Sequence, residues 1–380
     1  MKHFDKSLDR AIESGNVEKA RRLLGAGADL EMATCAGEVA LFGAAALGDV
    51  DMVRLLLEHG APLTINRNRT RGAHKRNNIS SAKDYAGSPE VKRLLMNSEA
   101  LHAAMQHGDI ERFRALIAEG GCVNAIESEH GASLTHKISR ADFVEALTSA
   151  GADWSKTHKE RSVVHSAVHP ELTSGKDVPG IVRAMARMGL NMNARGGNNV
   201  TPLLLALGSS EANGWYGREE VEASTLPGIV EALIESGADV NAESGDGRSA
   251  LVLAAMHNAV CCRPLLAAGA NVNHADSDGR TPLMEAAWRQ DEECVHLLLD
   301  SGADLDARDH GGQTARDHSA QDIEATAMEN PRSKIVQPNV IDKAIAVRER
   351  ARLLAAAQRT ASFAATGPDA DQTPTRRMRL

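Results

Sequence analysis

The sequence predicts an all-α solenoid, in which short helix pairs stack one after another along the chain. A phrase of the form Leu-Leu-x-x-Gly-Ala recurs down the 380 residues, 33 residues apart between Gly27 and Gly60 and again between Gly269 and Gly302. A fixed period of this length is typical of repeat architectures. Hydrophobic residues make up 42% of the chain and aromatic residues only 3%, which favours thin packing of Ala- and Leu-rich helices over one thick core.

A second phrase precedes the first and marks where each helix pair begins. Its best copy is DGRTPLMEAAWRQ, from Asp278 to Gln290. The Thr281 hydroxyl can cap a helix N-terminus, and Pro282 fits the first turn because its missing N–H has no helical partner there. The Ala pair that follows lets a second helix approach closely, and Gly302 supplies the left-handed residue that ends this second helix. Each pair then has an apolar side that only a neighbouring pair can bury.

Together the two phrases resemble the ankyrin repeat family, over roughly residues 6 to 320. The resemblance implies an ankyrin-repeat solenoid of about nine helix pairs plus a degenerate terminal repeat, GQTARDHSA, at Gly312–Ala320. Ser81–Leu95 resembles a worn repeat, which accounts for the 60-residue gap between Gly60 and Gly120.

The predicted solenoid occupies residues 1–330. Its inserted loops lie at about 65–80, 168–179 and 209–227. Long loops on a regular scaffold are often functional. A C-terminal helix follows within residues 331–365, for which Val340–Arg359 is the candidate. The Pro, Asp and Thr content of residues 366–380 predicts a flexible, disordered tail.

Cysteine usage and the lack of apolar runs indicate the compartment. The five cysteines are odd in number and form no CxxC pair, so neither a disulfide framework nor a zinc site is indicated. Free buried thiols are typical of a reducing compartment. The chain starts without an apolar run like a secretion signal, and no stretch is apolar enough to span a membrane. We expect a soluble, cytoplasmic protein, and the excess of Arg over Lys favours a bacterial or phage origin.

Histidines are the residues that most invite a catalytic or metal-binding reading. His165 and His169 have i, i+4 spacing with Glu171 nearby, which is a conceivable zinc pair. The ankyrin resemblance implies instead that His165 makes an internal hydrogen bond, as it does for His102 and His136. No HExxH, GxSxG or GxxxxGK[ST] motif occurs. We therefore expect no catalytic residue, cofactor or metal, and keep an enzyme with an unrecognised His-based site as the alternative.

The resemblance also implies where a partner binds. Ankyrin partners usually lie against the turn tips and the concave side of the first helices, which the two residues after each Ala pair should face. These positions are Ala46, Leu47, Gln106, His107, Met256, His257, Trp288 and Arg289, with Arg248 and Arg280 at neighbouring turn tips. Trp and Arg are the residue types most enriched at interface hot spots. The alternative is that Trp288 folds back over Met256 and only covers the stack.

Two insertions supply further candidates. Trp215 and Tyr216 are adjacent aromatics in an inserted loop, and they pack either on the protein itself or on a partner. The basic loop contains Arg67, Arg69, Arg71, Lys75 and Arg76. This loop could meet an acidic protein patch or phosphates, or be a solvated loop. Nucleic acid is disfavoured, because the loop lacks interleaved aromatics and the chain has a net charge of −8.

These observations predict a protein-binding scaffold, adaptor or stoichiometric inhibitor that engages one protein partner through the concave surface. We expect it to be monomeric alone, with no membrane contact. A secreted effector that enters a host cell without a cleavable signal peptide, and an immunity-type partner of a toxin, are alternatives. Fold does not fix function, so the sequence does not identify the partner.

Overall fold

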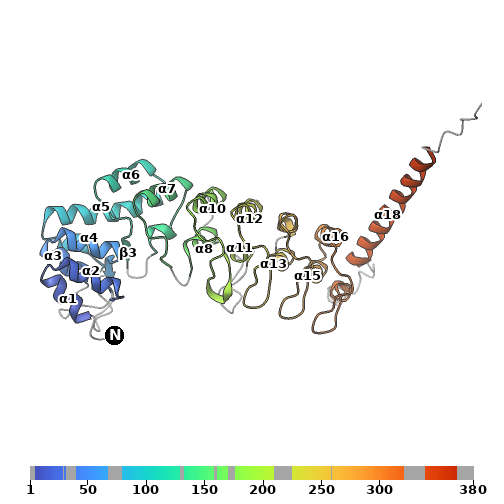
Figure 1. Cartoon of the computed structure of the whole chain (residues 1–380), viewed down its shortest axis with the longest axis horizontal. Coiled ribbons are helices and arrows are strands. Elements are labelled where there is room, and N and C mark those ends of the chain that lie inside the picture. The colour runs from blue at the N-terminus through green and yellow to red at the C-terminus, as the bar shows by residue number, and fades with distance from the viewer. Residues whose placement is uncertain are drawn as a thin grey trace, which may run out of the picture. The chain divides into compact units, whose positions relative to one another are not determined.

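A computed structural model of the chain shows a succession of helix pairs within the residues that it describes. It describes residues 5–28, 30, 40–66, 79–128, 132–157, 161–169, 176–208, 225–257, 259–320 and 339–365. The chain divides into two compact units. Unit 1 comprises Met1–Leu253 and Arg263–Ala270, and unit 2 comprises Ala254–Cys262 and Asn271–Leu380. Each unit is built from short stacked helices, so the predicted all-α repeat fold is confirmed (Figure 1).

Unit 1 contains most of the helix pairs. Its helices are α1 (Asp5–Glu13), α2 (Val17–Gly25), α3 (Ala40–Leu47), α4 (Val50–Glu58), α5 (Pro89–Gln106), α6 (Ile110–Ala118), α7 (Ala141–Ser149), α8 (Val163–Val168), α10 (Val178–Arg187), α11 (Pro202–Ala206) and α12 (Leu226–Glu235). Single 3-10 turns are η2 (Ala82–Tyr85), η3 (Leu134–His136) and η4 (Gly197–Asn199). The second helices α7, α10 and α12 pack side by side, and the first helices α8 and α11 pack beside them (Figure 1).

Unit 2 holds the last repeats. Its elements are η5 (Ala259–Cys261), α15 (Pro282–Trp288), α16 (Glu292–Asp300) and α18 (Val340–Ala365), with residues 315–320 also helical. The division between the units falls inside one repeat, since it passes through α13 (Ala250–His257) and α14 (Cys262–Ala267). Among the described residues, no helix combines the length and apolarity needed to cross a membrane.

The worn repeat differs from its sequence expectation. Its second helix and the first helix of the next repeat are fused into one 18-residue helix, α5. The linking sequence MNSEA contains neither Gly nor Pro, so nothing breaks the helix between them. Its first helix is reduced to the 3-10 turn η2, as η3 is in a later repeat. The worn repeat therefore still packs in the stack although the boundary between its second helix and the next helix is lost.

A small sheet lies at the base of the first inserted loop and was not expected from the sequence. Strands β1 (Pro62–Asn66), β2 (Ile79–Ser81) and β3 (Ile126–Ser128) have the order β2-β1-β3. β1 pairs antiparallel with β2 and parallel with β3. Leu63 is buried and Ile65 half-buried, and the alternation of apolar and polar residues from Leu63 to Asn66 is the sequence signal for this strand.

Repeat geometry is fixed by caps and by a recurring asparagine. The Asp291 carboxylate accepts the Cys294 N–H at 2.9 Å and caps α16. Asn193 donates its side-chain N–H to the Gly237 carbonyl at 3.0 Å, and its side-chain oxygen accepts the Asp239 N–H at 2.7 Å. The same donor bond to the glycine that ends the next repeat is made by Asn124, Asn241 and Asn273. These bonds set the spacing between consecutive repeats.

The C-terminal helix α18 packs on unit 2 through its first turns. Val340, Ile341 and Ala344 are buried, and α18 contacts α16. Lys343 pairs with Glu292 at 2.8 Å. Further along α18, Leu353 and Leu354 are exposed. The start of this helix therefore covers the end of the stack, and α18 runs on past the predicted Arg359 to Ala365.

Candidate functional site

The most prominent exposed side chains of α15 are at its C-terminal end. Pro282 through Ala287 are all buried, and the Ala pair at their end packs in the stack. Trp288 comes next and has 46% of its surface exposed, and Arg289, the C-cap, is exposed as well. An indole left half in solvent beside a guanidinium is a surface that suits binding. Four of the predicted partner-binding residues belong to unit 2, and we refer to them together as the unit 2 patch: Trp288, Arg289, His257 and Arg280.

The corresponding pair on α13 is split by burial. His257 is exposed, whereas Met256 keeps only 9% of its surface exposed. By their place after the Ala pair, both are predicted to lie on the partner-facing surface. Met256 offers almost no contact area, so it supports the packing of unit 2 and leaves His257 as the exposed member of the pair.

Arg280 is held by a buried carboxylate that the sequence analysis did not single out. Arg280 Nη1 donates to Glu285 Oε1 at 3.2 Å, and Glu285 is 2% exposed. Glu285 Oε2 is buried and makes no hydrogen bond within the described part of the chain. Glu285 and Trp288 are three residues apart on α15 and share one face. An acidic residue inside an otherwise apolar helix was the available signal.

Three further predicted positions lie in unit 1. Leu47, at the end of α3, is 60% exposed after the buried pair Ala44 and Ala45. Gln106 and His107 are exposed at the end of α5. The ring of His107 bonds the Ala103 carbonyl at 2.7 Å.

Arg248, the turn-tip residue of unit 1, is half-buried. Its Nε lies 3.3 Å from Asp246 Oδ2. The two loop candidates lie outside the described residues. These are Trp215 and Tyr216, and the basic-loop residues Arg67, Arg69, Arg71, Lys75 and Arg76.

The histidines of the repeats are engaged in internal hydrogen bonds. His165 is fully buried; its Nε2–H donates to the Val200 carbonyl at 2.9 Å, so its Nδ1 accepts the Ser162 hydroxyl at 2.8 Å. Both ring nitrogens are therefore occupied, and no lone pair is left for a metal. Glu171, the third member of the conceivable zinc set, lies outside the described residues.

His102 and His136 also make internal hydrogen bonds. His102 Nε2 bonds the Ala125 carbonyl at 3.1 Å, and burial lowers the pKa of His102 to about 4. His136 Nδ1 bonds the Ser133 hydroxyl at 2.8 Å. No cluster of three or more His, Cys, Asp or Glu side chains that could hold a metal occurs in the part of the chain that the structure describes.

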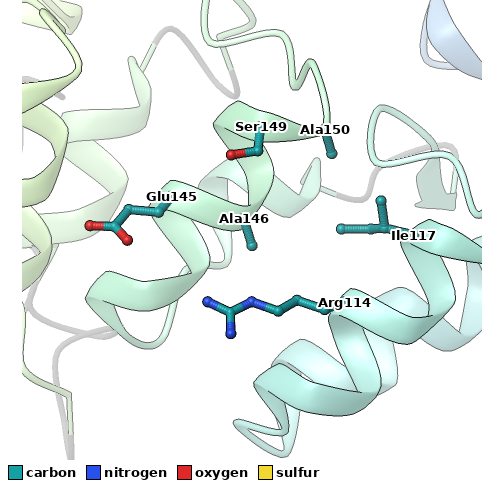
Figure 2. Close-up of a pocket in the computed structure, with 6 residues that line it drawn as sticks. All are labelled: Arg114, Ile117, Glu145, Ala146, Ser149 and Ala150. Atoms are coloured by element: carbon teal, nitrogen blue, oxygen red, sulfur yellow. The ribbon is translucent and has the colours of Figure 1, made fainter.

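A cleft of about 370 Å³ lies between the second helices α6 and α7. Figure 2 shows Arg114 and Ile117 of α6 opposite Ala146 of α7 and Ala150, the residue that follows α7. Its charged residues take part in exposed ion pairs, Arg114 with Glu111 at 3.4 Å and Glu145 with Arg187 at 3.9 Å. The remaining lining residue is Ser149, so apolar, ion-paired and hydroxyl side chains share the lining of this cleft.

Comparison with known proteins gives two matches. The family model described as "Ankyrin repeats (3 copies)" matches residues 8–125 and 221–309, which is more than half of the chain. A curated relative from Mus musculus, "B-cell lymphoma 3 protein homolog", is 29% identical over 170 residues. That match covers 41% of this chain and 37% of the relative, so the chain spans less than half the length of the protein that it resembles.

Proposed function

Because this chain belongs to the ankyrin repeat family, we propose that it binds one protein partner as a scaffold, adaptor or stoichiometric inhibitor. Stacked repeats of this kind present extended, rigid surfaces. A rigid surface loses little conformational entropy when it binds, which favours affinity. We assign the contact in unit 2 to the unit 2 patch, and Leu47, Gln106 and His107 are the corresponding candidates in unit 1.

The exposure of Trp288 carries this proposal. An indole that is 46% exposed, at the end of a helix whose preceding residues are buried, is available for contact without rearrangement of the stack. Trp and Arg dominate binding hot spots, and Trp288 and Arg289 are adjacent and both exposed.

Glu285 positions one of the cations of the patch. One of its oxygens accepts a hydrogen bond from Arg280, and the other is buried, out of reach of a partner. Arginine side chains carry N–H donors only. The partner we propose therefore presents an apolar side chain for Trp288 next to carboxylate or carbonyl acceptors for Arg280 and Arg289.

The test starts with a partner captured by the full chain from an extract of its source organism and then purified. We expect Trp288→Ala to weaken its affinity at least tenfold, as is common for a hot-spot Trp. Arg289→Ala should weaken it by a smaller factor. The matched control is Val260→Ala, which removes another exposed apolar side chain of unit 2, one that is 69% exposed and outside the patch.

An unchanged affinity for Trp288→Ala, with an unchanged melting midpoint, would show that the patch does not bind. A loss of melting midpoint together with affinity would instead favour the alternative in which Trp288 covers the stack. The same affinity loss for Val260→Ala would indicate a binding surface elsewhere in unit 2.

The alternatives make separate predictions. For a secreted effector, deletion of residues 361–380 should abolish export and leave folding unchanged. For a His-based enzyme, activity should be lost on mutation of His165 or His169 without loss of stability. The bacterial or phage origin, and the choice between tethering and inhibition, belong to this proposal and are tested by the identity of the captured partner.

A further inference from the structure

Two buried thiols face each other between neighbouring repeats of unit 2. Cys262 Sγ lies 3.3 Å from Cys294 Sγ. Both side chains are buried, as is the adjacent Cys261. Sulfur atoms of a disulfide are about 2.05 Å apart, so an approach of roughly 1.3 Å would close the bond. The two thiols belong to consecutive repeats, because Cys294 is in the first turn of α16 and α16 contacts η5.

The segment that carries Cys262 is one residue short. In each repeat the first helix carries an Ala pair, and a glycine ends the second helix. From the last Ala of the pair to this glycine there are 14 residues in the repeat of Cys262 (Ala255 to Gly269) and 15 in the repeat of Cys294 (Ala287 to Gly302). The shorter segment begins as the 3-10 turn η5 and becomes α-helical only at Cys262. A 3-10 start has poorer hydrogen-bond geometry than an α-helical one.

Helix α14 also lacks two supports that α16 has. Ala259 stands where Asp291 caps α16 in the next repeat, and its methyl group accepts no hydrogen bond. Pro264 stands where His296 lies in the second turn of α16, and unlike His296 it has no N–H to donate to the preceding turn. Val260 beside them is exposed. Local opening therefore requires less free energy at this segment than at α16, and opening exposes Cys262.

The closed state protects the pair. The hydrogen bond to Cys294, followed by burial, raises the pKa of the Cys262 thiol. A protonated thiol is a poor nucleophile. Reaction of Cys262 must therefore proceed through the opened segment, whereas Cys294 stays fixed in α16 by the capped helix that carries it.

We propose that Cys262 and Cys294 are a modification site at which a low-molecular-weight disulfide, such as oxidised glutathione, forms a reversible intramolecular disulfide joining two repeats. The Cys262 thiolate attacks one sulfur of oxidised glutathione, and the first glutathione leaves as a thiolate that takes up a proton. The Cys294 thiolate then attacks Cys262 Sγ and displaces the second glutathione. Two protein thiols lose two electrons and two protons, and one oxidised glutathione becomes two thiols.

The disulfide should stabilise unit 2. It would join residues 32 positions apart, and a covalent loop of this length restricts the unfolded chain. The Sγ atoms are already in contact in the folded state, so closing the bond requires little distortion. The oxidised protein should therefore melt at a higher temperature than the reduced protein.

The experiment oxidises the native full chain with oxidised glutathione and counts free thiols after denaturation. We expect a loss of two thiols per chain, restored by dithiothreitol, and a rise of roughly 5 °C or more in melting midpoint. Because Cys261 and Cys262 are adjacent, the link is mapped in the Cys261→Ser variant by mass spectrometry of unreduced peptides. That variant should still lose two thiols.

The controls separate the pair from the other thiols. Cys294→Ala should stop the reaction at the mixed disulfide of Cys262 with glutathione, so that at most one thiol is lost and the melting midpoint does not rise. Cys122→Ser should preserve both the loss of two thiols and the rise. Mild urea should accelerate oxidation of the wild type, since opening limits it. A link that involves any other cysteine, the absence of a link in the wild type, or oxidation only in fully unfolded protein would overturn the proposal.

Discussion

Replacement of His165 by alanine should destabilise unit 1 strongly, and this prediction separates the structural reading of the repeat histidines from the metal-binding one. His165 is fully buried and bonds both Ser162 and Val200, at 2.8 and 2.9 Å. Two hydrogen bonds contribute about 1 kcal/mol each, and a buried carbonyl left without its donor adds a further penalty. The cavity left by the ring also destabilises the packing. We expect a loss of about 3–5 kcal/mol in the free energy of unfolding.

The assay is urea-induced unfolding of the full chain followed by circular dichroism. His107→Ala is the matched control, because that ring is exposed and its single bond goes to a carbonyl of its own helix; its loss should stay within about 0.5 kcal/mol. Zinc should shift neither the wild type nor the variant. The reasoning would be refuted if the His165→Ala protein unfolded at the wild-type urea midpoint. It would also be refuted if zinc stabilised the wild type and the His165→Ala variant lost that stabilisation.

Three other predictions concern stability. Burial lowers the pKa of His102 from 6.5 to about 4, so on acidification His102 is protonated in the unfolded chain before it is protonated in the folded one. The free energy of unfolding should therefore fall by about 3 kcal/mol between pH 6.5 and 4. In urea titrations, His102→Gln should remove this dependence on pH. Gly87→Ala should destabilise the fold by about 3 kcal/mol, because its Cβ would collide with the Ala46 carbonyl oxygen. Both glycine variants are compared by thermal melts. Gly25→Ala is the control and should be neutral or stabilising, since no atom lies within 4 Å of the Cβ that it would add. Asn193→Ala removes two bonds between repeats and should lower the free energy of unfolding by about 1–2 kcal/mol, measured in urea.

The sequence predicted those parts of the fold that repeat. Gly302 has φ of 94° and ends α16, and Thr281 accepts the Met284 N–H at 3.4 Å, because the helix starts and stops are set by a few local residues. His165 was likewise readable, since its position in the repeat determines its carbonyl partner. Local rules that recur at a fixed period can be read from sequence because each copy confirms the others.

The features that were missed depend on single, non-repeating contacts. The fusion that gives α5 depends on the packing of neighbouring elements around one particular helix end. The pairing of β1 with β3 joins segments 64 residues apart. The burial of Met256 and the ion pair between Arg280 and Glu285 are set by packing around one repeat. A periodic pattern places a residue on a face but does not say how much of that face its neighbours cover.

Hydrogen–deuterium exchange of the full chain, with and without its purified partner, tests the central claim most directly. If the unit 2 patch is the contact, amides at the end of α15 and in the turn around Arg280 should exchange more slowly in the complex, while α6 and α7 around the cleft stay unchanged. Slower exchange confined to α6 and α7, with none at α15, would contradict the proposed surface.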